Sequence, residues 1–142
     1  MMISTKGRYA LRVMLDLAEN QNDGYIPLRD IAKRQEISEK YLETILPALI
    51  KNNFLEALRG KGGGYRLSRD PKSYTIGSIL KLLESGMAPV ACLEGENNYC
   101  ERATECKTLP MWKNLYKIID NYFEGITLAD LYKNGEQLNF VI

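Results

Sequence analysis

A glycine-rich, basic segment lies between two short β-compatible stretches, and it limits the folds open to this chain more than any other feature. The stretches are Phe54 to Leu58 and Tyr65 to Ser68, and the residues between them read Arg-Gly-Lys-Gly-Gly-Gly. Glycine supplies the backbone conformations of a tight hairpin tip, so we predict a two-stranded hairpin here. Because the rest of the chain shows helical periodicity, the sequence predicts a mainly α fold with one small β hairpin.

Three amphipathic segments precede the hairpin, each with apolar residues at helical spacing. The first begins near Ser4 or Thr5, the second follows Pro27, and the third begins after Ser38, which is a good N-cap. The third segment buries one face and leaves the other polar. Its expected core residues are Leu42, Ile45, Leu46, Leu49 and Ile50.

The composition excludes several classes of function. The chain has 142 residues, the size of one domain, and it contains no histidine. That absence excludes imidazole-based catalytic triads, histidine-ligated zinc enzymes and histidine pH switches. No other acid–base constellation is visible, so we do not expect an enzyme.

The chain also lacks the features of a membrane or secreted protein. Its longest stretch without a charged residue is Ser85 to Leu93, far below the roughly 20 apolar residues that a membrane helix needs. The three cysteines are an odd number, which fits a reducing compartment better than a disulfide scaffold. We therefore expect a cytoplasmic protein with no membrane partner.

Positive charge is concentrated around the predicted hairpin. The net charge of the whole chain is only +1, but residues 59–72 contain five basic side chains and one acidic side chain. Such a patch in a neutral chain indicates a polyanion-binding surface. A Walker-type phosphate loop is not the explanation, because these glycines precede a strand and not a helix.

The chain divides into three expected regions. Residues 1–84 form the compact part and end with a fourth helix that follows Thr75. Residues 85–107 lack periodicity and carry all three cysteines, so we expect an irregular loop whose length implies a function or disorder. Residues 108–142 hold a long amphipathic helix, a short helix with a capping-box pattern, and a tail.

The long helix carries apolar residues spaced alternately by three and four. This is the spacing of a coiled-coil-like seam, and the stripe is wider than one small core requires. A buried helix of an ordinary core is the alternative. We predict a homodimer interface formed by Trp112, Leu115, Ile119, Tyr122 and Ile126.

Three helices followed by a hairpin form the order of a winged helix-turn-helix, in which the third helix enters the major groove of DNA. The hairpin tip, or wing, would then approach the sugar–phosphate chain. A merely solvated helix face is the alternative for the third helix. The predicted contacts are Ser38, Glu39, Lys40, Tyr41 and Glu43 on that helix, and Arg59, Gly60, Lys61, Gly62 and Gly63 on the wing.

Four motifs together resemble one family. They are residues 4–10 (Ser-Thr-Lys-Gly-Arg-Tyr-Ala), 37–43 (Ile-Ser-Glu-Lys-Tyr-Leu-Glu), 59–65 (Arg-Gly-Lys-Gly-Gly-Gly-Tyr) and 126–131 (Ile-Thr-Leu-Ala-Asp-Leu). They resemble bacterial regulators of the Rrf2 family, typified by IscR, NsrR and CymR. The resemblance implies a homodimer, joined through the long helix, on palindromic double-stranded promoter DNA. It also implies that Glu43 and Arg59 read bases, while DNA-backbone contacts come from Ser4, Lys6, Arg8 and Tyr9.

The resemblance also implies a cofactor. In IscR-like and NsrR-like members, three cysteines of this loop hold an iron–sulfur cluster, and Cys92, Cys100 and Cys106 occupy that place here. A 2Fe–2S cluster is favoured over a 4Fe–4S cluster. Leu109 and Arg8 stand where IscR-like and NsrR-like members have a fourth ligand, so that ligand is unknown. The candidate carboxylates are Glu94, Glu96, Glu101 and Glu105.

The expected function is a DNA-binding transcription regulator that senses iron–sulfur status, redox state or nitric oxide through this cluster. A zinc site is an alternative use of the thiols. A metal-free regulator controlled by thiol oxidation or by a partner protein is another. A small redox carrier fares worst, because the Cys-x2-Cys spacing of ferredoxins and thioredoxins is absent.

Overall fold

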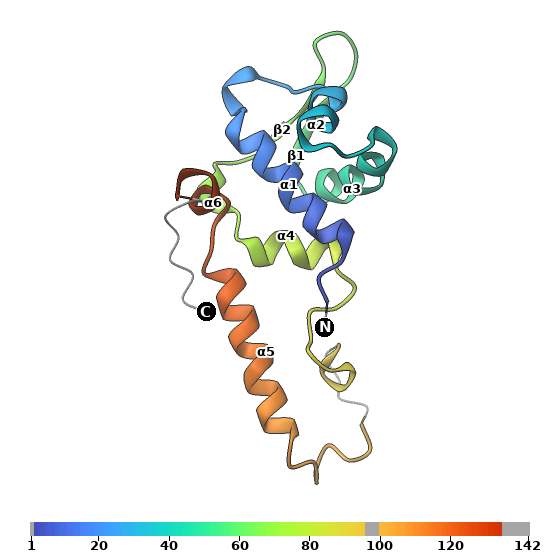
Figure 1. Cartoon of the computed structure of the whole chain (residues 1–142), viewed down its shortest axis with the longest axis vertical. Coiled ribbons are helices and arrows are strands. Elements are labelled where there is room, and N and C mark those ends of the chain that lie inside the picture. Colours follow the sequence, from blue (N-terminus) through green and yellow to red (C-terminus); the bar gives the residue numbers. More distant parts are fainter. Residues whose placement is uncertain (1, 96–99, 135–142) are drawn as a thin grey trace.

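The computed structural model describes residues 2–95 and 100–134 (Figure 1). Figure 1 shows a head from which one long helix projects as a rod. None of the helices in the described ranges is long and apolar enough to cross a membrane. The helices and strands are α1 (Thr5–Glu19), α2 (Leu28–Gln35), α3 (Glu39–Lys51), β1 (Leu55–Leu58), β2 (Gly64–Leu67), α4 (Ile76–Leu83), α5 (Leu109–Glu124) and α6 (Leu128–Asn134), with short 3-10 turns at η1 (Gln21–Asp23), η2 (Pro71–Ser73) and η3 (Ala91–Leu93).

The order of elements confirms the predicted mainly α fold with a winged helix-turn-helix and a long C-terminal helix. The helix starts follow from local capping. Ser4, Ser38 and Thr75 each accept a hydrogen bond from the backbone N–H three residues later. Thr127 and Asp130 form the expected reciprocal capping box, with N–H to side-chain distances of 2.9 and 3.2 Å.

The core of the head is built mainly from α1, α3, α4 and α6. Leu128 of α6 is fully buried in this core, and its N–H donates to the carbonyl of Tyr74 at 2.9 Å. Residues 108–134 therefore supply both the rod α5 and a helix of the head. The largest fully buried side chains are Tyr74, Met14, Leu17, Ile31, Leu42, Ile45, Leu46, Leu49, Ile79, Leu80, Leu128 and Val13.

The hairpin is antiparallel, with Leu55 opposite Leu67 and Leu58 opposite Gly64. Each strand begins one residue away from the predicted start, and Phe54 lies outside β1. The reason is that the N–H of Phe54 donates to the carbonyl of Leu49 at 2.8 Å, closing the turn after α3. Its carbonyl accepts the N–H of Ser68, the residue directly after β2, at 3.3 Å.

Tyr74 ties the open end of the hairpin together. Its hydroxyl donates to the carbonyl of Phe54 at 2.8 Å and accepts the N–H groups of Ser68 and Arg69 at 3.1 Å each. The side chain is fully buried. One phenol therefore satisfies backbone groups from both sides of the wing.

Replacing Tyr74 with Phe should lower the free energy of unfolding by about 1–3 kcal/mol, since partly buried backbone groups lose their partner. Urea unfolding measures this effect. Tyr25→Phe is the matched control, because the ring of Tyr25 contacts the guanidinium of Arg66 and Phe keeps that ring. Equal stability of the two variants would contradict the role assigned to the Tyr74 hydroxyl.

Candidate functional site

The first turns of α3 present polar side chains to solvent, while the opposite face of the helix is buried. Tyr41 is half-buried, and the ring of Tyr9 meets it edge-on with centroids 5.3 Å apart. This contact sets the start of α1 beside the start of α3. The exposed side chains of α3 on this face are Ser38, Glu39, Lys40, Glu43 and Thr44.

The start of α1 carries the residues expected to hold the DNA backbone. Lys6 and Arg8 are exposed, and the guanidinium of Arg8 donates to the hydroxyl of Thr5 at 3.1 Å. In Figure 1, the start of α1 lies below α3, and the hairpin tip projects from the top of the head. The predicted DNA-contact residues are thus carried by three elements of the head: the start of α1, α3 and the hairpin tip.

The wing tip has the conformation that its glycines predict. Gly60 and Gly62 have φ angles of 90° and 77°, in the region that other residues rarely adopt. A side chain at Gly63 would collide with the carbonyl of Leu58. The tip is therefore a thin strip of backbone that can approach a nucleic acid closely.

The basic residues around the wing separate into two groups, which the sequence alone did not distinguish. Arg66 pairs with Glu56 across the hairpin at 2.8 Å. The guanidinium of Arg69 lies over the ring of Tyr74, 4.5 Å from its centroid. In contrast, Arg59 and Lys61 are exposed and form no ion pair with any residue that the structure describes. Their charges stay available for a ligand.

Ser4 has an intramolecular partner that the sequence does not signal. Its hydroxyl accepts the N–H of Gly7 at 3.0 Å and donates to the carboxylate of Glu84 at 2.8 Å. Glu84 follows α4 and carries no motif. No feature of the sequence connects it to the start of α1, because 80 residues separate the two.

The three cysteines lie between α4 and α5 and are not joined in disulfides. Cys92, on η3, and Cys106 are half-buried, whereas Cys100 is exposed. The sulfur of Cys106 lies 3.3 Å from the hydroxyl oxygen of Thr108. Hydrogen bonds from Thr108 lower the pKa of the Cys106 thiol. A surface hollow beside this thiol is lined by Arg102, Glu105, Cys106, Lys107 and Thr108.

The donor chemistry of this loop fits an iron–sulfur cluster, because thiolates are the soft ligands that such clusters need. The described donors, however, are not gathered around one point. Within residues 2–95 and 100–134, no group of three or more His, Cys, Asp or Glu side chains is placed to hold a metal ion. Glu96, one candidate for the fourth ligand, lies outside the described residues.

The rod α5 exposes part of its apolar stripe. Leu115 and Tyr122 are 37% and 47% exposed, and Met111 and Ile118 are more exposed still, at 54% and 57%. Trp112 and Ile119 are half-buried. Ile126, also predicted for a dimer interface, lies beyond α5 and packs in the same chain against Ile76, Leu80 and Met87.

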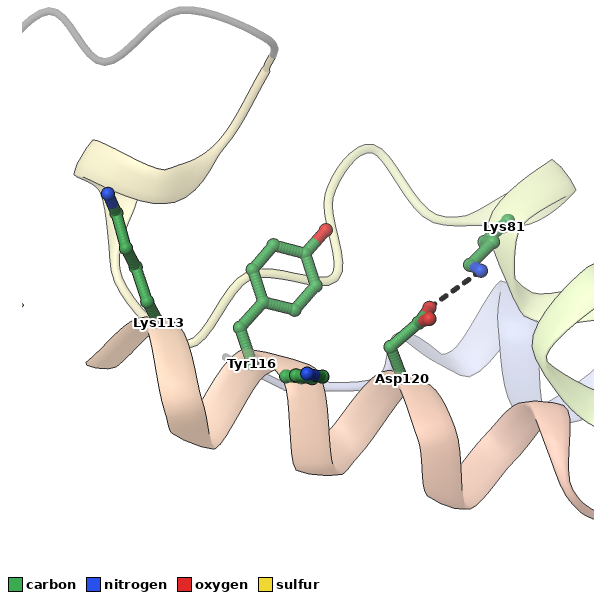
Figure 2. A pocket seen from close by; sticks show the side chains of 5 residues that line it. Lys81, Lys113, Tyr116 and Asp120 are labelled. Atoms are coloured by element: carbon green, nitrogen blue, oxygen red, sulfur yellow. Dashed lines mark ion pairs between the residues drawn. The ribbon is translucent and has the colours of Figure 1, made fainter. Parts of the chain in front are cut away.

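Charged contacts fix the other side of α5 to α4. The amine of Lys81 lies 2.6 Å from the carboxylate of Asp120 and 2.9 Å from that of Glu124. Hydrogen bonds raise the pKa of Lys81, and the bond to Asp120 has a larger effect than the bond to Glu124. Figure 2 shows the hollow beside this pair, with Lys113 and Tyr116 on its wall. These contacts leave the apolar stripe facing away from α4.

Comparisons by family model, by sequence and by structure all find the same family of proteins. A family model, Rrf2, described as "Iron-dependent Transcriptional regulator", matches residues 3–134. The chain is 36% identical over 138 residues to the HTH-type transcriptional regulator IscR of Yersinia pseudotuberculosis, covering 97% of this chain and 83% of that protein.

Solved structures with the same fold include CymR, titled the global cysteine regulator of B. subtilis. Its TM-score is 0.76 at 32% identity, and the match covers 94% of this chain and 97% of that one. T. potens IscR matches with a TM-score of 0.74 at 32% identity, covering 100% and 93% of the two chains. With this fold and this extent of similarity, the chain belongs to the Rrf2 family and is a DNA-binding transcription regulator of that type.

Proposed function

We propose that this chain acts as a homodimer on a palindromic operator and that its cysteine loop senses iron–sulfur status, redox state or nitric oxide. The observation that carries the proposal is the exposed polar face of α3, flanked by a wing tip whose Arg59 and Lys61 have no ion-pair partner among the described residues. A helix of this kind reads base edges in the major groove.

In this proposal, each exposed side chain has a role that its chemistry supports. Glu43 accepts from a cytosine amino group, and Lys40 donates to guanine or to phosphate. Arg59 enters the narrow groove at the wing, where the glycine tip gives the backbone room to approach. Lys6 and Arg8 hold the phosphates and set the register of the head on the duplex.

Selection of DNA from a random library by the purified protein tests the DNA-binding part. The selected operator should bind far more tightly than random competitor, and its two half-sites should lie about one helical turn apart or a small multiple of it. A protein with no preference for any selected sequence would refute the proposal.

Arg59→Ala and Lys61→Ala should each weaken operator binding and reduce the slope of log K against log salt concentration by about 0.9, the effect of one lost phosphate contact. Fluorescence anisotropy at several salt concentrations measures the slope. Arg66→Ala is the matched control, because Arg66 pairs with Glu56 and is already neutralised. Unchanged slopes for both tip variants would remove the wing from the interface.

The proposed sensor uses Cys92, Cys100 and Cys106 as ligands, with a fourth ligand from a carboxylate, another oxygen donor or an external thiol. When bound, an iron–sulfur cluster supplies reactivity toward oxidants and nitric oxide. The chain would respond by ordering or releasing residues 85–107 beside α5, which alters the spacing of the two heads. Two half-buried thiols, Cys92 and Cys106, the second with a lowered pKa, support this use of the loop.

Metal and sulfide analysis of protein purified without oxygen tests the sensor. Iron, sulfide and visible charge-transfer absorption are expected, and all three should be lost when the three cysteines are replaced by alanine. Zinc in place of iron would favour a thiolate zinc site.

A second candidate function has its own observation. The described cysteines are not joined in disulfides and are not gathered into a metal site, while Cys106 has a lowered pKa. A metal-free regulator controlled by thiol oxidation or by a partner protein fits these facts. Colourless, iron-free protein that cannot be reconstituted, together with an operator response that depends on the cysteines, would favour this candidate over the cluster.

A further inference from the structure

We propose that Glu84 is a positioning residue for DNA binding, which holds the first turn of α1 against the end of α4. This inference rests on the proposed DNA interface and adds to it a residue outside that surface. The first turn of α1 carries Lys6 and Arg8, which are predicted to contact the DNA backbone. The segment after Glu84 leads directly to the cysteine loop, so one side chain links the two.

One carboxylate oxygen of Glu84 makes both contacts to Ser4. It accepts the backbone N–H of Ser4 at 2.9 Å and the hydroxyl of Ser4 at 2.8 Å. The same hydroxyl accepts the N–H of Gly7, the N-cap bond of α1. Removal of the Glu84 side chain therefore frees the capping residue itself.

Gly7 supplies independent evidence that this contact is built into the fold. Gly7 is buried inside α1, where alanine is normally more favourable. A methyl group at Gly7 would collide with the carboxylate of Glu84. Glycine thus provides the space in which the Glu84 carboxylate lies against the helix.

A second contact leads from the same segment into the cysteine loop. The side chain of Glu94 lies over Gly86, so that a methyl group at Gly86 would be 2.9 Å from a carboxylate oxygen of Glu94. Gly86 is two residues after Glu84, and Glu94 is two residues after Cys92. Figure 1 shows the start of the chain beside this loop. The segment after Glu84 is therefore in contact both with the segment that follows Cys92, through Glu94, and with the first turn of α1, through Glu84.

If Glu84 acted on DNA binding only through its charge, its effect would be opposite to that of a positioning residue. A carboxylate close to phosphate repels it, so a purely electrostatic role means that removing Glu84 tightens binding. A positioning role means that removal weakens binding, and that glutamine, which keeps an acceptor oxygen, preserves it. The two roles differ in the sign of the effect.

The first test compares Glu84→Ala and Glu84→Gln for binding to an operator selected by the wild-type protein. We expect Glu84→Ala to weaken binding by about 10-fold, comparable to the loss of one strong contact, and to speed amide hydrogen exchange at residues 4–8. The operator affinity of Glu84→Gln should stay within about 2-fold of the wild type, because glutamine keeps an oxygen that can accept the same hydrogen bonds. Glu19→Ala, at the exposed far end of α1, controls for the loss of one negative charge. Binding by Glu84→Ala that equals or exceeds that of the wild type overturns the proposal.

The second test needs no DNA and therefore separates this inference from the proposed function. Gly7→Ala should lower the midpoint of thermal unfolding in the wild-type background, because it displaces the carboxylate. In the Glu84→Ala background, Gly7→Ala should instead raise the midpoint by about 3 °C, because the higher helix propensity of alanine is then the only remaining effect. A rise in both backgrounds would overturn the inference. Absence of operator preference in the wild-type protein would refute the proposed function and leave this result intact.

Discussion

Ile118→Glu should convert the protein from a dimer to a monomer and weaken operator binding by about 100-fold or more. Ile118 is 57% exposed on α5 and is not part of either apolar cluster of the head, so the fold of the single chain does not depend on it. In the proposed dimer, however, the new carboxylate would be buried without a partner. A monomer reads one half-site and loses the gain from binding two at once.

Sedimentation at micromolar concentration measures the oligomeric state, and anisotropy with one-site and two-site DNA measures the affinity. Asn121→Glu is the matched control, since Asn121 is an exposed polar residue of the same helix. Circular dichroism should be unchanged in both variants. A dimer that persists in Ile118→Glu with normal operator affinity would show that the apolar stripe of α5 is not the interface.

Local sequence signals predict most of the fold, because local interactions cause it. Apolar periodicity places the helices, and the capping residues Ser38 and Thr75 set their starts within one residue. The hairpin is predicted by its glycines. The strand ends are less accurate, because the hydrogen bond of Phe54 to Leu49 depends on the end of α3 and not on β propensity.

The candidate site is predictable only in part. The exposed face of α3 follows from its buried face, and both are visible in the periodicity. The different roles of Arg59 and Arg66 are not, because they depend on which strand partner each side chain meets. Glu84 is missed for the same reason. A contact across 80 residues leaves no periodic or compositional trace.

Asp16 is the other residue whose role needs the structure. It lies among the apolar residues of α1, and its side chain is only 1% exposed. Arg34 of α2 donates two hydrogen bonds to its two oxygens at 2.8 and 2.9 Å, and the side-chain amide of Gln35 donates a third at 2.9 Å. This arrangement fixes α2, the first helix of the helix-turn-helix, to α1.

Arg34→Ala should therefore cost about 3 kcal/mol of unfolding free energy, because it leaves the carboxylate of Asp16 buried without its cation. Asp16→Leu should cost less, since the side chain of Arg34 is 40% exposed and its charge can be solvated. Urea unfolding at one fixed protein concentration measures both. Arg29→Ala on the same helix is the control, because Arg29 is 80% exposed and its pair with Asp30 is 3.9 Å long.

The double variant Asp16→Leu/Arg34→Met tests whether the ion pair stabilises the fold more than two apolar side chains would. The alternative is that the pair adds no stability and that only the loss of one partner is costly. Replacing a buried ion pair by apolar groups of similar size is often neutral or stabilising, whereas removing one partner is not. We expect the double variant to be within about 1 kcal/mol of the wild type, well above Arg34→Ala. If the double variant is instead as unstable as Arg34→Ala, then the hydrogen-bonded geometry itself holds α2 to α1. The placement of α2 against α1 would in that case depend on this carboxylate and not on the apolar contacts around it.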